Sequence, residues 1–217
     1  ATQGFMELNN EKTNQLLSTH YNVNENFAKK IGIHKEDIFP FVYGLLNSAD
    51  YKKYYANDLK KDLARIPPVY PKEEYIKIGK KLIDLHLNYE QVPIYKECKY
   101  TYSGPINYKV REMKFARKRN AEGKLKKDRS TIIFNDSITI ENIPEKAYQY
   151  IINGKSAIEW IMDQYQVKTD KKSGITDDPN DYSNDKKYIF NLLLRIINVS
   201  VQTVDLINQL PPLAIEK

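Results

Sequence analysis

The spacing of apolar residues changes twice along this chain, and the change limits the folds that it can adopt. Apolar residues recur at helical spacing from Ile38 to Leu85. From about Val92 to Ile143, apolar and polar residues alternate as they do in strands, and helical spacing returns at Pro144. We therefore predict an α+β fold, in which helices at both ends pack around a small antiparallel sheet that carries a basic hairpin.

Start and stop signals give the approximate limits of these elements. Ser48 and Ser156 suit the N-caps of two helices, and turns are expected at Gly123 and at Asn135-Asp136. We expect Tyr51, Tyr55, Ile66 and Trp160 to be core residues. The predicted helices cover residues 25–30, 37–47, a segment that starts at 49 and is ended by Pro67-Pro68, 72–88, 144–154, 157–167 and 188–210. The predicted strands lie within residues 93–102, 106–115 and 130–143, and residues 168–187 are expected to form a polar loop.

The positive charge of the chain is concentrated in residues 109–129. This segment holds ten Lys and Arg residues against three Asp and Glu residues, an excess of +7, whereas the whole chain carries +6. Cations on a two-stranded ribbon can neutralise phosphates, and such a ribbon can enter the major groove of DNA. The segment therefore indicates contact with nucleic acid. The alternative is an exposed hairpin whose charges only keep the protein soluble.

The polar loop, residues 168–187, holds five aspartates, and Lys168, Lys171 and Lys172 lie at its start. Its aspartates do not have the spacing of an EF-hand and lack the closing Glu, so turn formation is a better explanation for them than a metal site. Contact with DNA is expected from the cations of both segments. The predicted DNA-binding residues are Lys109, Arg111, Lys114, Arg117, Lys118, Arg119, Lys124, Lys126, Lys127, Arg129, Lys168, Lys171 and Lys172.

Several classes of site are not expected. His20, His34 and His86 show no metal-ligand spacing, and the chain contains no Walker, GxGxxG, GxSxG or HExxH motif. We therefore predict no catalytic residue and no metal site. The single cysteine, Cys98, excludes an internal disulfide and favours a reducing, cytoplasmic setting. No apolar run reaches 18 residues, so no membrane-spanning helix and no membrane partner are expected.

The stretch FVYGLLNSADYKKYYANDLKKDLARIPPV, residues 41–69, resembles a segment of bacterial adenine-specific DNA methyltransferases that are fused to restriction machinery. In those proteins a YGxLNSxxYxxxYxxxLKxDxxRIP run follows the catalytic domain and opens the target-recognition region. Residues 132–181 and 192–213 resemble the same family. The matching residues of the first motif are Tyr43, Gly44, Leu46, Asn47, Ser48, Tyr51, Tyr55, Leu59, Lys60, Asp62, Arg65, Ile66 and Pro67.

The subgroup that the chain resembles is the single-polypeptide, ATP-dependent, type I-like restriction-modification enzymes, called type ISP. The resemblance implies a target-recognition domain over residues 36–213, with an irregular lead-in at 1–35 and a tail at 214–217. It implies that the chain binds double-stranded DNA and directs adenine methylation and cleavage. These reactions would belong to the methyltransferase, motor and nuclease domains of the same polypeptide.

On this interpretation the chain alone is not an enzyme and has no cofactor of its own. Two alternatives remain open. The chain could be a non-catalytic docking module for the methyltransferase or motor domain, with only nonspecific DNA contact. It could also be a small nuclease that uses the Asp-rich loop.

Overall fold

The computed structural model describes residues 25–55, 66–67 and 69–215. Most of the predicted lead-in, the motif residues Leu59, Lys60, Asp62 and Arg65, and the predicted helix stop at Pro68 lie outside the described residues. The contacts divide the chain into two compact units. Unit 1 comprises residues 89–201, and unit 2 comprises the described residues before 89 and after 201.

Unit 2 is mainly helical, as the apolar spacing predicted. Ser48 caps α4 as predicted, because its side chain accepts a hydrogen bond from the Tyr51 amide at 3.3 Å. The elements are α2 (Glu25–Ile31), the 3₁₀ turn η1 (Lys35–Asp37), α3 (Ile38–Asn47), α4 (Ala49–Tyr54), α6 (Lys72–Leu87), and the two-residue strands β1 (Val69–Tyr70) and β10 (Ala214–Ile215), which pair antiparallel.

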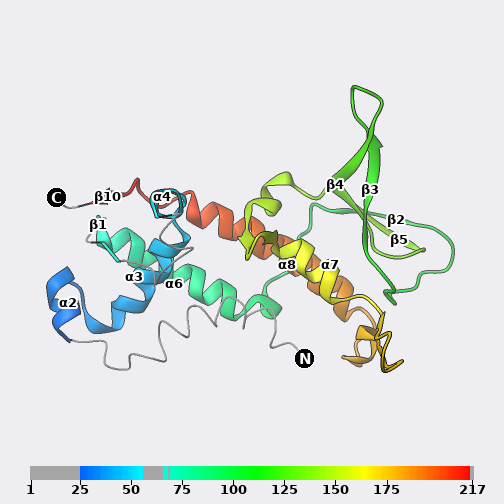
Figure 1. Cartoon of the computed structure of the whole chain (residues 1–217), viewed down its shortest axis with the longest axis horizontal. Coiled ribbons are helices and arrows are strands. Elements are labelled where there is room, and N and C mark those ends of the chain that lie inside the picture. Colours follow the sequence, from blue (N-terminus) through cyan, green and yellow to red (C-terminus); the bar gives the residue numbers. More distant parts are fainter. Residues whose placement is uncertain (1–24, 56–65, 68, 216–217) are drawn as a thin grey trace. The chain divides into compact units, whose positions relative to one another are not determined.

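Two glycines allow α3 and α6 to cross with their backbones in contact (Figure 1). A Cβ atom on Gly79 would lie 1.9 Å from the carbonyl oxygen of Pro40, and one on Gly44 would lie 2.3 Å from that of Tyr75. Neither position therefore has room for a side chain. The crossing brings Phe41 and Leu45 of α3 against Tyr75 of α6, and all three side chains are fully buried.

A buried polar chain links α3, α6 and the end of α8 (Tyr188–Ile207) within unit 2. The Tyr43 hydroxyl lies 2.7 Å from Nδ1 of His86, and Nε2 of His86 lies 2.8 Å from Oγ1 of Thr203. Burial, with a smaller contribution from the charge of Lys52, lowers the pKa of His86 to about 4. The imidazole is therefore neutral at pH 7.

Unit 1 contains a four-stranded antiparallel sheet with the strand order β2-β5-β4-β3. Ile132, Phe134 and Ile140 are fully buried, and the Phe134 ring lies 5.4 Å from that of Phe190 on α8. The elements are η2 (Tyr89–Gln91), β2 (Lys99–Tyr102), β3 (Lys114–Arg119), β4 (Leu125–Ile133), β5 (Ile138–Glu141), η3 (Glu145–Gln149), β6 (Ile151–Ile152), β7 (Lys155–Ser156), α7 (Ala157–Gln164), β8 (Lys168–Thr169), β9 (Thr176–Asp177), η4 (Pro179–Asp181) and the first part of α8.

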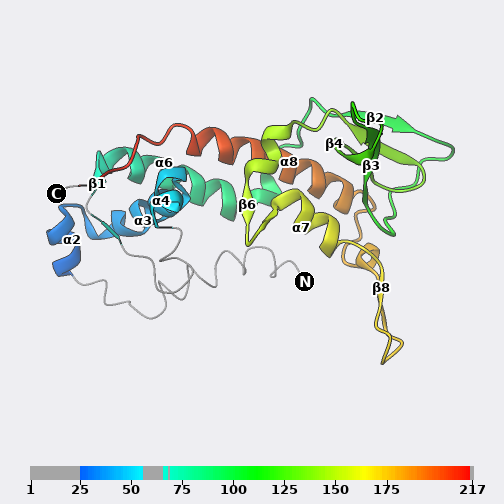
Figure 2. The ribbon, with the colours of Figure 1, turned by 45° about the horizontal axis from the view of Figure 1, so that its top comes forward.

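Three predictions for unit 1 are wrong in detail. Residues 93–98 and 106–113 are not strands, because side chains satisfy backbone groups there. Asn180 accepts from the amide and donates to the carbonyl of Val110, both at 2.8 Å, and Asn142 donates to the carbonyl of Glu97 at 2.7 Å. The predicted helix 144–154 is a 3₁₀ turn followed by the β6–β7 hairpin. Its turn is Asn153-Gly154, with both residues at positive φ, the usual signal for a two-residue hairpin. The predicted loop 168–187 contains the β8–β9 hairpin (Figure 2).

Trp160 is only partly buried, which differs from the prediction of a core residue, while Tyr51 is fully buried as predicted. The Trp160 indole instead donates from Nε1 to the carbonyl of Ile152 at 2.7 Å, so it braces the β6–β7 hairpin. Tyr55 and Ile66 are half-buried and pack against the core of unit 2.

The last helix, α8, is long and apolar, as the sequence predicted. Among the described residues it is the one helix whose length and composition would allow it to cross a membrane. Its most apolar stretch is 61% buried inside the protein, which is the environment of a core helix.

Replacing Gly79 with Ala is expected to lower the free energy of unfolding by about 3 kcal/mol or more, because the new methyl group collides with the α3 backbone. Urea unfolding of the variant measures this loss. The matched control is Lys77→Ala on the exposed side of the same helix, which should change stability by less than about 0.5 kcal/mol. Equal stability of the two variants would contradict the close crossing.

Stability should also decrease when the pH is lowered, because His86 is buried in its neutral form. Its pKa is about 4 in the folded chain and about 6.5 in the unfolded chain, so the unfolded chain binds more protons between these values. Neutral His86 therefore contributes up to about 3 kcal/mol to the free energy of unfolding. This contribution is complete above pH 6.5 and is lost as the pH falls toward 4. Urea unfolding at pH 7.5 and 4.5 should show a smaller difference for His86→Gln than for the wild type. The same difference in both would assign the acid sensitivity to other groups.

Candidate nucleic-acid interface

Strands β3 and β4 continue beyond the sheet as a two-stranded ribbon, which we call the basic ribbon (residues 116–128). Strand β4 pairs with β5 only at Ile132 and Ile133, so the ribbon residues pair with each other alone. Figure 1 shows the ribbon standing away from the rest of unit 1. At its tip the side chain of Asn120 accepts hydrogen bonds from the amides of Glu122 and Lys124, and Gly123 has φ +76°. The predicted turn at Gly123 is confirmed.

A bulge separates the basic ribbon from the sheet. Phe115 pairs with Ile132 but Ala116 pairs with Asp128, so three residues of β4, 129–131, have no partner on β3. Asp128 stabilises this bulge, because Oδ1 accepts from the amide of Ser130 at 3.1 Å and from its hydroxyl at 2.7 Å. These bonds from Ser130 are the main cause that lowers the pKa of Asp128. The bulge also turns Arg129 away from the ribbon.

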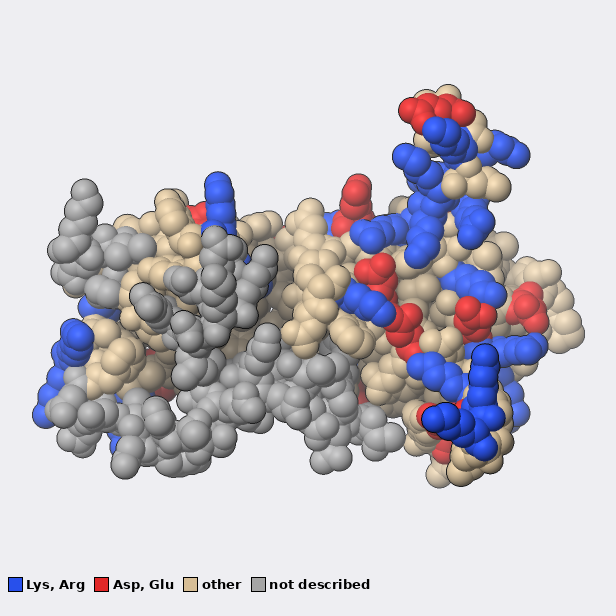
Figure 3. Space-filling view, viewed as in Figure 1, with Lys and Arg blue, Asp and Glu red and all other residues tan. Residues whose placement is uncertain are grey.

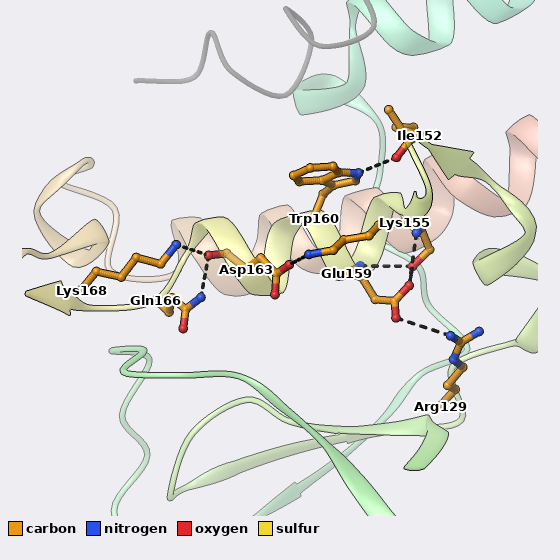
Figure 4. A network of polar contacts seen from close by, with 9 residues as sticks. Arg129, Ile152, Lys155, Glu159, Trp160, Asp163, Gln166 and Lys168 are labelled. Atoms are coloured by element: carbon orange, nitrogen blue, oxygen red, sulfur yellow. Dashed lines mark hydrogen bonds and ion pairs between the residues drawn. The ribbon is translucent and has the colours of Figure 1, made fainter. Parts of the chain in front are cut away.

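Arg129 is held against α7 and η3 instead of projecting from the ribbon (Figure 4). Its guanidinium lies 3.4 Å from a carboxylate oxygen of Glu159 and 5.4 Å from the ring centre of Tyr148. The Tyr148 hydroxyl donates to the carbonyl of Arg129 at 2.6 Å. The other carboxylate oxygen of Glu159 accepts from the amide and hydroxyl of Ser156, which completes the predicted cap of α7 as a capping box.

The remaining residues predicted to bind DNA fall into two groups. In the first group the ammonium is already paired: Lys114 with Glu112 at 2.8 Å, Lys118 with Asp128 at 3.1 Å, and Lys124 with Glu122 at 3.5 Å. Lys168 donates to the carbonyl of Asp163 at 2.8 Å. The second group forms no ion pair with any carboxylate that the structure describes. It contains Lys109, Arg111, Arg117, Lys126, Lys127, Lys171 and Lys172, whereas Arg119 belongs to the first group because its guanidinium donates to the carbonyl of Gly123 at 2.8 Å.

The register places cations directly opposite one another on the basic ribbon. Arg117 faces Lys127, and Lys118 faces Lys126. Like charges in directly opposed positions destabilise a ladder. In Figure 3, Lys and Arg side chains cover much of the ribbon on the face that is shown. A bound polyanion would relieve this repulsion.

The β8–β9 hairpin is a second projection that carries lysines (Figure 2). Asp170 fixes its tip by accepting from the amides of Lys172 and Ser173, and the backbone hydrogen bond from Ser173 is the main cause that lowers the pKa of Asp170. Asp178 similarly accepts from the amide of Asn180. These aspartates form turns, as the sequence predicted. Within the described residues, no three His, Cys, Asp or Glu side chains lie close enough to hold a metal ion.

Sequence reasoning missed two contributors near this surface. Lys155, between the Asn153-Gly154 turn and α7, forms an ion pair with Asp163 and lies 5.3 Å from the ring centre of Trp160. Asn180, inside the Asp-rich loop, fixes the segment around Val110. No charge cluster marks either residue in the sequence. Cys98 is buried, and burial raises the pKa of its thiol to about 11, which makes it unreactive.

A family model and solved structures both match this chain and indicate the same family. A family model described as the Type ISP C-terminal specificity domain matches residues 1–192. A search of curated proteins found no match. Among solved structures, the chain is 52% identical to the ATP-dependent Type ISP restriction-modification enzyme LlaBIII bound to DNA, with a TM-score of 0.78, covering 89% of this chain and 12% of that one.

Two further solved structures are similar. A nuclease-deletion mutant of the Type ISP restriction-modification enzyme LlaGI, in complex with a DNA substrate mimic, is 55% identical with a TM-score of 0.75, covering 85% of this chain and 14% of that one. A DrdV–DNA complex is 26% identical with a TM-score of 0.69, covering 87% and 19%. The chain therefore spans less than a fifth of each of these proteins.

Arg129 and Arg117 should respond differently to the same substitution. Arg129→Ala is expected to lower the free energy of unfolding by about 1 kcal/mol, because it removes an ion pair and a cation–π contact. Arg117→Ala, which removes an unpaired cation from the basic ribbon, should leave stability within about 0.5 kcal/mol of the wild type. Urea unfolding of both variants is the measurement. A larger loss for Arg117→Ala would show that the roles of the two arginines are reversed.

Proposed function

This chain belongs to the family of Type ISP C-terminal specificity domains, and we propose that it recognises a double-stranded DNA sequence on behalf of a larger restriction-modification enzyme. In this role it selects the sites at which other domains of the same polypeptide methylate adenine and cleave DNA. The chain itself carries out neither reaction and uses no cofactor. The enzyme acts in the cytoplasm, where it meets DNA.

The observation that carries this proposal is the basic ribbon: its end at the sheet is held in place by side-chain contacts, and several of its Lys and Arg side chains form no ion pair within the described residues. Half or more of the hydrogen bonds in protein–DNA complexes go to phosphates and sugars, and base edges in the major groove supply the sequence information. A two-stranded ribbon is narrow enough to enter that groove. Three similar proteins were solved in complex with DNA or a DNA substrate mimic, and this supports DNA as the ligand here.

The rigidity of the ribbon base favours recognition over simple docking. A module that only anchors a neighbouring domain does not need a hairpin whose base is fixed by Asp128, Arg129 and Tyr148. A surface that reads a sequence does need it, because its side chains must reach base edges at fixed positions. The docking module with nonspecific DNA contact is therefore the second candidate.

Exchange of this chain between two full-length family members with different targets tests the proposal. If the chain selects the site, the methylated adenines should move to the target of the donor, because the catalytic domains are unchanged. Sequencing that detects N6-methyladenine maps these positions. A matched control exchanges a segment of similar length outside this chain. Methylation that stays at the original site after the chain exchange would favour the docking module.

A further inference from the structure

The two faces of the basic ribbon differ in charge because strand residues alternate. Arg117 and Arg119 share one face with their partners Lys127 and Leu125, and we call this the inner face. Ala116 and Lys118 share the other face with Asp128 and Lys126, and we call this the outer face. The inner face carries three cations and no carboxylate, whereas the outer face carries two cations and one carboxylate.

One of the two cations of the outer face is neutralised within the protein. Asp128 lies 3.1 Å from the ammonium of Lys118 and stays ionised, because hydrogen bonds from Ser130 and Lys118 stabilise its carboxylate. Lys126 is left as the one cation on this face without a partner among the described residues.

The inner face lines a groove of about 340 Å³ whose other wall is α7 together with Lys155 of β7. Its residues include Phe115, Arg117 and Lys127 on one side, and Glu159, Met162 and Asp163 on the other. The carboxylates of the α7 wall are occupied, as Figure 4 shows: Glu159 contacts Arg129 and Ser156, and Asp163 pairs with Lys155. Arg117 and Lys127 are therefore the uncompensated charges of the groove.

We propose that this groove receives the phosphodiester backbone of the DNA duplex, with Arg117 and Lys127 as phosphate ligands, and that the outer face of the ribbon stays in solvent. This inference rests on the proposed function and specifies the DNA-contacting surface within it. It assigns Lys118 and Lys126, which the sequence predicted to bind DNA, to the solvent side.

The chemistry of the groove fits a phosphate better than a base edge. Arg binds phosphate with two parallel hydrogen bonds, and Lys binds it as a point charge. A phosphate between Arg117 and Lys127 also removes the repulsion of this directly opposed pair. A base amino group needs a hydrogen-bond acceptor, and both groove carboxylates on α7 already have partners. Arg can also donate to O6 and N7 of guanine, but loss of such a contact would weaken binding to the target duplex more than to others, whereas loss of a phosphate contact weakens both alike. The apolar side chains of Phe115 and Met162 can contact the sugars.

Two double variants of the full-length protein test the groove: Arg117→Ala with Lys127→Ala, and Lys118→Ala with Lys126→Ala. Each pair removes two positive charges from neighbouring positions of the same ribbon, so long-range electrostatics change equally. Binding to target and non-target duplexes is measured at several salt concentrations. Thermal melting of each variant verifies that the fold is intact.

The inner pair should weaken binding to both duplexes by roughly a hundredfold, because two charge-assisted contacts are lost. It should reduce the slope of log affinity against log salt by about 1.8, while the ratio between target and non-target affinity stays unchanged. The outer pair should weaken binding less than about threefold. Lys127→Ala and Lys126→Ala give the same comparison with single, adjacent substitutions.

Equal losses for the two pairs would overturn the groove as the phosphate site and leave DNA recognition by the chain intact. An unchanged affinity and salt slope for the inner pair would also overturn it. Failure of the proposed function is a separate result, namely a wild-type protein that does not prefer its target duplex. In that case the two pairs would still report on the groove through nonspecific binding.

Discussion

The hydrogen bonds at the base of the basic ribbon determine where its charges point. Three residues of β4 have no partner on β3, and a bulge of this kind would leave the ribbon free to swing if it were not fixed. Asp128 fixes the bulge from within the strand, and Tyr148 and Glu159 fix it from η3 and α7. Because Glu159 also completes the cap of α7, the start of that helix and the base of the ribbon share one carboxylate.

Unit 2 is stabilised in a different way, by the absence of side chains at one crossing. Gly44 and Gly79 let the α3 and α6 backbones touch, and the surrounding aromatic side chains fill the space on either side. The polar chain through His86 then satisfies the hydrogen-bonding groups that this close packing buries. The YGxLNS part of the motif in residues 41–69 therefore has a structural meaning: Gly44 makes the contact, Tyr43 bonds His86, and Ser48 caps α4.

Part of the candidate site could be predicted from the sequence and part could not. The excess of Lys and Arg in residues 109–129 identified the ribbon, because these cations lie close together in the sequence. The same count could not separate Arg129 from Arg117, since pairing depends on where Glu159 lies in space, 30 residues away. Lys155 was missed for the converse reason, because it stands alone in the sequence and reaches the groove only through the β6–β7 hairpin.

The sequence by itself determined that a sheet-forming region lies between two helical regions, and it determined the caps at Ser48 and Ser156 and the location of the positive charge. These features depend on residues close in the chain, so local spacing and composition are enough to specify them. Only the tertiary structure decided that residues 106–113 form a loop, since the bonds that replace a strand partner come from Asn135 and Asn180. It also decided which face of the ribbon keeps its charge, because register and bulge set whether a cation meets a carboxylate, and both depend on contacts between distant segments.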